Sequence, residues 1–446
     1  MRVIVANDAL KDHVDTIREV FFYANRFKGR TFVIQIEYGI IAHPLLSVLV
    51  KDLVLLHRAG IRIVIVPGAR QRIDDVLERY GVETRKHNGV RISTPEAIPF
   101  IKMAAFDASN RVMTLLSAND TNAVIGNWVR ARSLGVVDGV DYHNAGVVEK
   151  VKINLLTNVL DDGIIPIFPC IGWSVTGKPY NISSRELAAT LAIELKADKL
   201  FYVAETNGIE PSSYRLPEGI DIAPDGHISR MTLLEAGMFV EMNHERTDDT
   251  PVELVSLAHR AGTHGVERVH IVDGRAEGVV LKEIFSNLGF GTMVHANQYQ
   301  SIRPMRLEDA TDVVRLMEPF VRKGILVKRT EAEMAERFRD YVVYETDGSI
   351  HGCGALHPFD DATAEIAGLA VDPKYDHLGI GQKIVEFLID RARTLRLNRV
   401  FVLTTQTSDW FDRQGFRAGE LPDIPDARRA TYNTSRNSRV FVFELE

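Results

Sequence analysis

The chain reads EIAGLAV from Glu365 to Val371 and, two residues later, KYDHLGIGQK from Lys374 to Lys383. The first run is mostly apolar and predicts a strand, and the glycine-rich turn after it opens a helix. The apolar residues that share one face of this helix are Ile380, Ile384, Phe387, Leu388, Ala392 and Leu395. The two glycines of the turn let the backbone approach a diphosphate, whose oxygens are attracted by the free N–H groups of the first helical turn. The stretch therefore suits a pyrophosphate.

A glycine pair at a helix start is weak evidence by itself, because such glycines more often serve only a tight turn or close packing. Here the surrounding residues resemble the acetyl-CoA motif of GNAT acetyltransferases: Val371 and Pro373 end the strand, Tyr375 follows, and Gly379 and Gly381 open the helix. The resemblance implies that acetyl-CoA is the cosubstrate and contacts Leu369, Ala370, Val371, His377, Leu378, Gly379, Ile380, Gly381 and Gln382.

A second GNAT-like element follows in the sequence. Residues Val400 to Thr404 predict a strand, and Ser408 to Phe416 resemble the short helix closed by Gly-Phe in many such domains. One position departs from the pattern, because Asp376 replaces the usual Gln or Arg at the start of the pyrophosphate loop. The backbone donors do not depend on that side chain, so we expect weaker cofactor affinity and not a loss of binding.

Composition excludes several other classes of protein. The 446 residues carry a formal net charge of −7, which gives no general attraction to nucleic acid or to an anionic membrane surface. No run approaches the roughly 18 apolar residues of a membrane span. Cys170 and Cys353 are the only cysteines and lie outside any Cys/His cluster, so neither a disulfide framework nor a metal site is expected. We expect a cytoplasmic protein.

The residues before the GNAT motifs follow the strand–helix–strand rhythm of an α/β domain. Apolar segments such as Thr31 to Ile36 and Lys199 to Ala204 predict strands with both faces covered, and thus a mainly parallel sheet. We expect a helical segment over 1–28, an α/β domain over 29–294, a linker over 295–301 and an α+β GNAT domain over 302–446.

The two domains together resemble the bacterial N-acetylglutamate synthase family, in which an amino-acid-kinase-like domain precedes a GNAT domain. The resemblance spans nearly the full chain and is carried by Gly68 to Asp74, Ser174 to Gly177, Asn181 to Ser183, His270 to Arg275, Glu283 to Phe285, Gly289 to Thr292, Phe401 to Thr405, Trp410 to Phe411, Tyr432 to Asn433 and Arg436 to Ser438. It implies a three-layer αβα first domain and transfer of acetyl to the amino group of L-glutamate, the first step of arginine biosynthesis.

The kinase-like domain is expected to have lost phosphoryl transfer. Active amino-acid kinases carry a Lys-x-Gly-Gly turn after their first strand, whereas this chain reads QIEY from Gln35 to Tyr38. The carboxylate that organises the site is replaced by Arg185. Without those charges the transition state of phosphoryl transfer would not be stabilised, so we interpret the domain as regulatory and structural.

The resemblance also implies an effector site for L-arginine at His270, Glu283 and Gly289, where Glu283 could pair with a cationic amino acid. The alternative is that His270 and Glu283 only cap and solvate a strand and a helix. A basic residue that the family often has near the start of the helix at Val252 is replaced by Pro251, so the effect of arginine stays open.

Acetyl transfer requires a neutral amine, so a base must remove a proton from the ammonium group of the acceptor. Glu365 matches the family's catalytic glutamate and would act directly or through a water; without that match it would be interpreted as a solvated carboxylate at a strand end. Backbone N–H groups near Leu369 and Ala370 could polarise the thioester carbonyl.

The family pattern places the contacts to the dicarboxylate acceptor at Leu326, Lys328, Gly368, Arg436 and Ser438. Lys328 stands where the family usually has Arg, which removes a bidentate fork, and the adjacent Arg329 could compensate.

Two other interpretations stay open. A GNAT enzyme of the same architecture could act on a different amine, since Asp376 and Lys328 are both altered positions. A non-catalytic sensor of arginine and acetyl-CoA is the second, although Glu365 and Arg436 argue against it. The resemblance further implies a homo-oligomer, either a tetramer or a hexamer.

Overall fold

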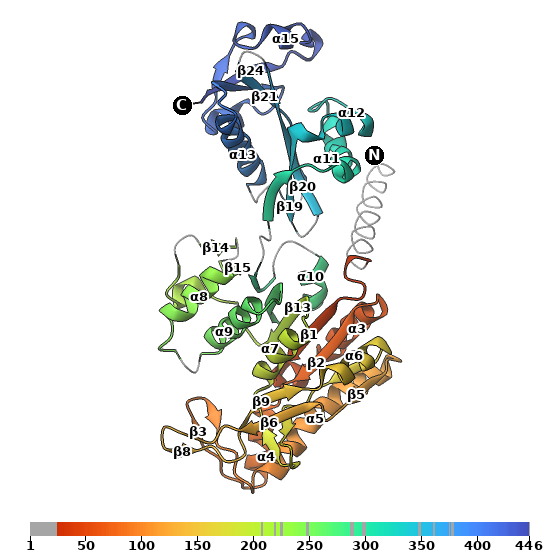
Figure 1. Cartoon of the computed structure of the whole chain (residues 1–446), viewed down its shortest axis with the longest axis vertical. Helices are drawn as coiled ribbons and strands as arrows, with labels where there is room; N and C mark the ends of the chain where they lie inside the picture. Colours follow the sequence, from red (N-terminus) through yellow and green to blue (C-terminus); the bar gives the residue numbers. More distant parts are fainter. Residues whose placement is uncertain are drawn as a thin grey trace. The chain divides into compact units, whose positions relative to one another are not determined.

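The first part of the chain is built on a nine-stranded sheet in the computed structural model (Figure 1). Its strands, in order across the sheet, are β14 (Asp221–Ile222), β15 (Ile228–Thr232), β17 (Thr292–His295), β16 (Arg268–Asp273), β13 (Lys199–Ala204), β1 (Thr31–Ile36), β2 (Arg62–Pro67), β10 (Ile165–Ile167) and β5 (Ala123–Ile125). Neighbours are parallel except at β14–β15 and β16–β17. The prediction of a mainly parallel sheet is confirmed.

The structure describes residues 25–206, 208–217, 220–223, 226–246, 249–285, 290–296, 300–346, 349–359, 362–373, 375 and 379–445. Most of the helical segment expected over 1–28 therefore lies outside the described residues. The chain divides into two compact units, 1–297 and 298–446.

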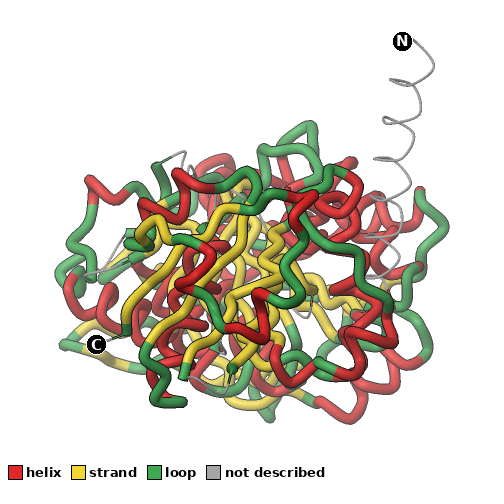
Figure 2. Tube along the Cα trace, turned by 90° about the horizontal axis from the view of Figure 1, so that it is seen from above, coloured by secondary structure: helices red, strands yellow, loops and turns green. Residues whose placement is uncertain are grey.

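Helices cover both faces of the nine-stranded sheet, which confirms the three-layer αβα architecture. Side chains alternate along a strand, so Ile34 of β1 packs on one face and Val33 on the other. The helices that contribute to the cluster on the Ile34 face are α2 (Tyr38–Ala42), α3 (Leu46–Arg58), α4 (Arg70–Arg79), α5 (Ile98–Ala118) and α10 (Val279–Phe285). Those that contribute to the cluster on the Val33 face are α6 (Ile153–Asp161), α7 (Ser184–Glu194), α8 (Leu233–Met242) and α9 (Thr250–Thr263). In Figure 2 the helices flank the strands.

A second, four-stranded sheet in the same unit is not predicted by the sequence pattern. Its order is β12 (Pro179–Asn181), β11 (Ile171–Trp173), β6 (Val129–Ser133) and β9 (Gly146–Val151). These strands are only three to six residues long, and β9 leaves most of its residues partly or fully exposed. Such short segments carry too little hydrophobic alternation to be recognised. Two small hairpins, β3 (Lys86–His87) with β4 (Val90–Arg91) and β7 (Val136–Val137) with β8 (Val140–Asp141), accompany it.

The second unit is built on a seven-stranded sheet. Its strands, in order, are β18 (Gln300–Pro304), β19 (Tyr341–Thr346), β20 (Ser349–Pro358), β21 (Thr363–Val371), β22 (Arg399–Thr404), β24 (Arg439–Glu444) and β23 (Arg417–Gly419). Helix α13 (Ile380–Thr394) packs on one face, where Gly352 and Gly354 leave room for Ile384. Helices α11 (Ala310–Arg322) and α12 (Glu331–Glu336) cover the other face. The mixed sheet with helices on both faces agrees with the predicted α+β domain.

The first α-helix of this unit is not capped by the side chain of the residue before it. It runs as α11 from Ala310 to Arg322, and the side chain of Asp309 makes no capping bond to it. The Asp309 carboxylate instead accepts hydrogen bonds from the Arg303 guanidinium at 2.7 and 3.0 Å. The same carboxylate also accepts a hydrogen bond from the Arg306 N–H at 2.7 Å, so both of its oxygens already have partners outside α11.

Strands β21 and β22 run parallel but separate after a short contact. Within these fully described strands, pairing is confined to Thr363 to Glu365 opposite Arg399 to Phe401. Beyond Glu365 the edges of β21 and β22 diverge, so backbone groups that a continuous ladder would use become available to a ligand. This opening positions the candidate active site.

Candidate active site

Strand β21 carries a bulge at Gly368, three residues after Glu365. The register with β20 shifts there, and neither Gly368 nor Leu369 has a partner in it. Gly368 has a φ of +61°, and a Cβ at this position would lie 3.2 Å from the Tyr341 hydroxyl. Both the backbone conformation and the close approach require glycine. The bulge frees backbone groups from the ladder at the place where polarising N–H groups are predicted.

Helix α13 begins immediately after the glycine-rich turn. Gly379 is its N-cap residue, has a φ of +64° and provides no side-chain cap. The N–H groups of Ile380, Gly381 and Gln382 belong to the first turn, where helical N–H groups lack partners within the helix. The described part of the predicted acetyl-CoA motif therefore presents a helix N-terminus and uncapped donors to an anion. His377 and Leu378, together with Asp376, lie outside the described residues.

The predicted base Glu365 is held by an arginine that sequence reasoning missed. Arg428 lies in α15 (Asp426–Arg429) and donates from Nε to Glu365 Oε2 at 2.6 Å and from Nη2 to Oε1 at 3.1 Å. The Glu365 side chain is 10% exposed and that of Arg428 is 24% exposed. A bidentate pair fixes the plane of the carboxylate. The only available signal was that a buried carboxylate needs a cation, which does not say which arginine supplies it.

A histidine–aspartate pair lies next to Glu365 on the neighbouring strand. His357 is the cross-strand partner of Glu365, and its Nδ1 lies 2.8 Å from Asp340 Oδ2. Burial lowers the pKa of His357, although the nearby Asp340 carboxylate opposes this change. The neutral ring then carries its proton on Nδ1 and donates it to Asp340, so Nε2 is an acceptor. Nε2 is buried and has no hydrogen-bond partner in the described part of the chain.

The predicted substrate-binding residues come from two segments that the structure connects. Arg436, in the short helix η6 (Thr434–Arg436), donates from Nη2 to Ile325 O at 2.7 Å and to Gly324 O at 3.2 Å. Arg436 therefore ties η6 to the segment that carries Leu326 and Lys328. The N–H of Leu326 donates a hydrogen bond to Phe320 O at 3.2 Å, so this N–H is not available to a substrate.

Lys328 and Ser438 differ in how far they are enclosed. Lys328 is exposed, whereas Ser438 is partly buried and its carbonyl accepts a hydrogen bond from the Tyr432 hydroxyl at 2.7 Å. The residues near the opening between β21 and β22 are thus Glu365, Gly368 and the described residues between Gly368 and Gln382. These positions remain predictions as ligand contacts.

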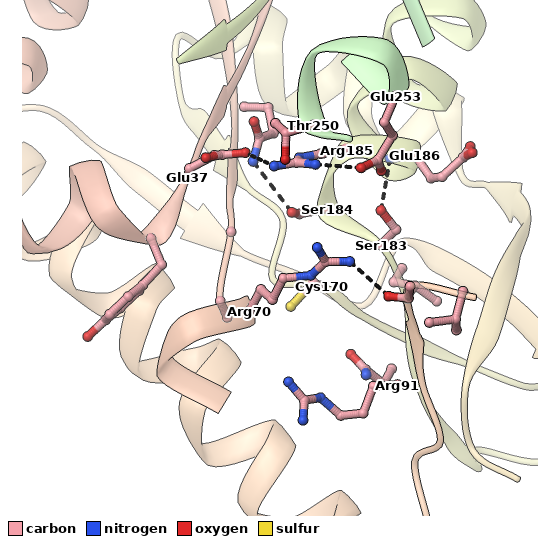
Figure 3. A pocket seen from close by; sticks show the side chains of 18 of the residues that line it. Glu37, Arg70, Arg91, Cys170, Ser183, Ser184, Arg185, Glu186, Thr250 and Glu253 are labelled. Atoms are coloured by element: carbon pink, nitrogen blue, oxygen red, sulfur yellow. Dashed lines mark hydrogen bonds and ion pairs between the residues drawn. The ribbon is translucent and has the colours of Figure 1, made fainter. Parts of the chain in front are cut away.

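The kinase-like unit contains a cavity of about 1410 Å³, shown in Figure 3. Arg185 lies in it between two carboxylates: it forms an ion pair with Glu37, and its Nη1 lies 2.5 Å from Glu253 Oε2. Burial disfavours the charged guanidinium, but the two carboxylates outweigh that effect and raise the pKa of Arg185. Glu37 follows β1 directly, at the turn where active kinases carry their lysine. The end of β1 thus presents a carboxylate where a phosphate would need a cation.

The predicted effector residues His270 and Glu283 contact each other in the interior of the same unit. His270 Nδ1 lies 2.9 Å from Glu283 Oε1, and the two side chains are 2% and 3% exposed. Burial, followed by the charge of Lys199, lowers the pKa of His270 to about 4. The pKa of Glu283 is also lowered, because hydrogen bonds from His270 and from the Phe290 N–H outweigh its burial. The third residue, Gly289, lies outside the described residues.

This buried pair predicts a pH dependence of stability. The pKa of His270 is about 4 when folded and about 6.5 when unfolded, so between these pH values only the unfolded chain binds the proton. The free energy of unfolding should therefore fall by about 1.4 kcal/mol per pH unit as the pH drops through this range. We expect the Tm of the native chain to fall more steeply from pH 6.5 to 4.5 than that of His270→Gln. Parallel slopes would show that His270 is not neutral in the fold.

The described residues contain no cluster of three or more His, Cys, Asp or Glu side chains that could hold a metal ion. None of the helices in the described ranges is long and apolar enough to cross a membrane. Cys170 and Cys353 are both buried and form no disulfide with each other.

Comparisons with known proteins agree with this architecture. Residues 37–219 match the amino acid kinase family, and residues 308–416 match the acetyltransferase (GNAT) family. The amino-acid acetyltransferase of Pseudomonas paraeruginosa is 32% identical over 98% of this chain and all of its own length. The enzyme of the same name from Pseudomonas putida is 33% identical over 97% of this chain and 99% of its own.

A solved structure matches both domains, in the same order along the chain. N-acetylglutamate synthase from Neisseria gonorrhoeae, complexed with coenzyme A and L-arginine, has a TM-score of 0.83 and 30% identity over 97% of this chain and 99% of its own. The same protein complexed with coenzyme A and N-acetyl-glutamate has a TM-score of 0.59 and 31% identity over the same shares. The kinase-like fold, the GNAT domain with its opening between β21 and β22, and full-length similarity together show that this chain belongs to the amino-acid acetyltransferase family and uses acetyl-CoA.

Proposed function

We propose that this chain is an N-acetylglutamate synthase, which transfers acetyl from acetyl-CoA to the amino group of L-glutamate. The observation that carries the proposal is the buried carboxylate of Glu365, which lies where β21 separates from β22. Support comes from relatives that are named amino-acid acetyltransferases and match over their full length. Further support comes from a similar protein whose complex contains coenzyme A and N-acetyl-glutamate.

The proposed mechanism assigns proton removal to Glu365. The acceptor enters as an ammonium ion, and Glu365 takes a proton from it directly or through a water, which leaves the nitrogen lone pair free to attack the thioester carbonyl. Arg428 holds both carboxylate oxygens and so orients the base. Backbone N–H groups at the Gly368 bulge would receive the developing oxyanion. The C–S bond then breaks, the nitrogen loses its second proton, and the departing thiolate takes up a proton, so that coenzyme A is released as the free thiol.

The N-terminus of α13, where the N-cap residue Gly379 makes no side-chain cap, is the proposed site for the pyrophosphate of acetyl-CoA. Gly379, Ile380, Gly381 and Gln382 would provide backbone donors there. Leu369, Ala370 and Val371 would provide the edge of β21, which no longer pairs with β22. Since α13 packs on the sheet that carries Glu365, the cofactor's acetyl group would be brought to the base.

We also propose that the kinase-like domain, 29–294, regulates the enzyme and does not transfer phosphoryl groups. The ion pairs of Arg185 with Glu37 and Glu253 support this, because they fill the former catalytic position with a structural network. His270, Glu283 and Gly289 are the proposed contacts for L-arginine. A guanidinium that bound Glu283 would have to replace its hydrogen bond from His270. A cytoplasmic location and a tetrameric or hexameric assembly are proposed on the family resemblance alone.

The test is a panel of amino acids offered with acetyl-CoA, with free thiol release as the readout and L-arginine added in a second series. We expect turnover with L-glutamate to exceed turnover with any other amino acid by at least about 100-fold in kcat/KM, because a site built for a charged group rejects acceptors that lack it. Preferred turnover of another amine would replace glutamate as the acceptor. Binding of acetyl-CoA without turnover of any amine would identify a sensor, and a rate unaffected by arginine would remove the effector proposal.

A further inference from the structure

The predicted anchors for the acceptor's carboxylates are not equally suited to bind one. Arg436 donates to Gly324 O and Ile325 O and so has part of its guanidinium committed to the fold. Lys328 is exposed, and an exposed ammonium is strongly hydrated and forms weak ion pairs. A third cation in the same segment, Arg329, has neither drawback.

Arg329 is a partly buried cation that forms no ion pair with any residue the structure describes. Among the described residues, no hydrogen-bond acceptor or carboxylate lies in bonding distance of its guanidinium, which contacts the ring of Tyr341 with Cζ 5.4 Å from the ring centroid. Burial lowers the pKa of Arg329, and the charge of Glu365 opposes this change. A desolvated guanidinium without a counter-ion weakens the fold and is retained where a ligand supplies the missing charge.

The neighbours of Arg329 place it beside the reacting groups. Tyr341 is fully buried, and its hydroxyl has no hydrogen-bond partner in the described part of the chain. That hydroxyl lies 3.2 Å from the position of a Cβ on Gly368, at the bulge of β21 three residues after Glu365. Glu365, whose carboxylate acts to raise the pKa of Arg329, lies on the same face of the sheet as Cys353. An orphaned donor and an unneutralised cation therefore face the same small region.

We propose that Arg329, together with the Tyr341 hydroxyl, binds a carboxylate of the acceptor amino acid and is the main determinant of its selection. A carboxylate there would accept charge-assisted hydrogen bonds from the guanidinium and one from the phenol, which satisfies both groups at once. Arg329 is thus a specificity-determining residue and provides the planar fork that Lys328 cannot offer. The assignment rests on the proposed acetyl transfer to an amino acid.

The test compares Arg329→Gln, Arg329→Lys and Lys328→Gln with the native chain, and uses Lys323→Gln as the control. Lys323 is an exposed cation at the end of α11 with no assigned role. Acceptors are L-glutamate, L-glutamine, which lacks the side-chain carboxylate, and the α-amide of glutamate, which lacks the other. We expect Arg329→Gln to raise KM for L-glutamate by about 30-fold or more and Arg329→Lys to restore part of the loss.

Two further readouts separate binding from a structural role. Arg329→Gln should lose the preference for glutamate over one of the two amides. The carboxylate that this amide lacks is the one that Arg329 binds. KM for acetyl-CoA should stay within about twofold of the native value, because the thioester is not a partner of Arg329. The Tm of Arg329→Gln without substrate should equal or exceed that of the native chain, since an unneutralised buried charge is removed.

The proposal is overturned if Arg329→Gln keeps the native KM, if it loses glutamate and both amides equally, or if its Tm falls by several degrees. A larger loss in Lys328→Gln than in Arg329→Gln would also overturn it. Should the native chain prefer another amino acid, the proposed acceptor is wrong, but the same variants with that amino acid and its amide still decide the role of Arg329.

Discussion

Replacing Glu365 with Gln should lower kcat/KM for the acceptor by about 10²- to 10⁴-fold, the range typical of a lost general base. Gln has nearly the same shape as Glu and can still accept one hydrogen bond from Arg428, but it cannot take a proton. The remaining rate should increase with pH, because more of the acceptor is then a neutral amine before it binds. Steady-state thiol release over a pH series measures both effects.

Glu336→Gln is the matched control, because Glu336 is an exposed carboxylate at the end of α12 on the same unit. Its activity should stay within about twofold of the native value. Affinity for coenzyme A, measured by calorimetry, should be unchanged in Glu365→Gln. A loss of less than tenfold, or an equal loss of coenzyme A binding, would show that the Glu365–Arg428 pair serves the fold and not proton transfer.

Arg185→Leu should destabilise the first unit by about 3 kcal/mol, the low end of the range for breaking a buried ion pair, because Glu253 is 36% exposed. The substitution leaves the Glu37 carboxylate, whose side chain is only 19% exposed, without a counter-ion beside a second carboxylate. Urea unfolding measures the change. Trp128 and Trp173 lie in the first unit, so fluorescence in a Trp410→Phe background reports on that unit alone.

The control for this prediction also removes the two carboxylates that lose Arg185 as their counter-ion. Glu37→Gln and Glu253→Gln, combined with Arg185→Leu, should recover most of the lost stability, since no uncompensated carboxylate then remains. Acetyltransferase activity at saturating substrate should change little in any of these variants if the network is structural. A stability equal to that of the native chain in Arg185→Leu alone would mean that water already neutralises Glu37.

Much of the architecture could be predicted because it depends on long, regular patterns. The apolar residues of the helix from Ile380 to Thr394 recur at helical spacing, so its buried face can be recognised in the sequence. Strands β1 and β13 are mostly apolar runs that become fully buried. Gly379 was singled out from a motif, and its positive φ gives a physical reason for the residue. Local chemistry dictates these features, so sequence reasoning reaches them.

The rest depends on contacts between residues far apart in the chain. Arg428 lies 63 positions from Glu365, and no local pattern connects them. Residue type alone does not predict that Arg329 lies against Tyr341, or that the Leu326 N–H already donates a hydrogen bond to Phe320 O. The four-stranded sheet that contains β9 was missed for the same reason, since its short strands become stable only through their partners.

Strand β24 follows both β22 and β23 in the sequence, yet it lies between them. The edges of β22 and β23 that β24 joins therefore stay unpaired unless residues 439–444 are present. Open edges recruit strands from other molecules. A chain that ends before residue 439 would lack the strand that connects β22 to β23. It would leave the edges of both strands unpaired, so it should aggregate. Fragments for structural work are better taken with the whole of 298–446 than trimmed behind the catalytic motif.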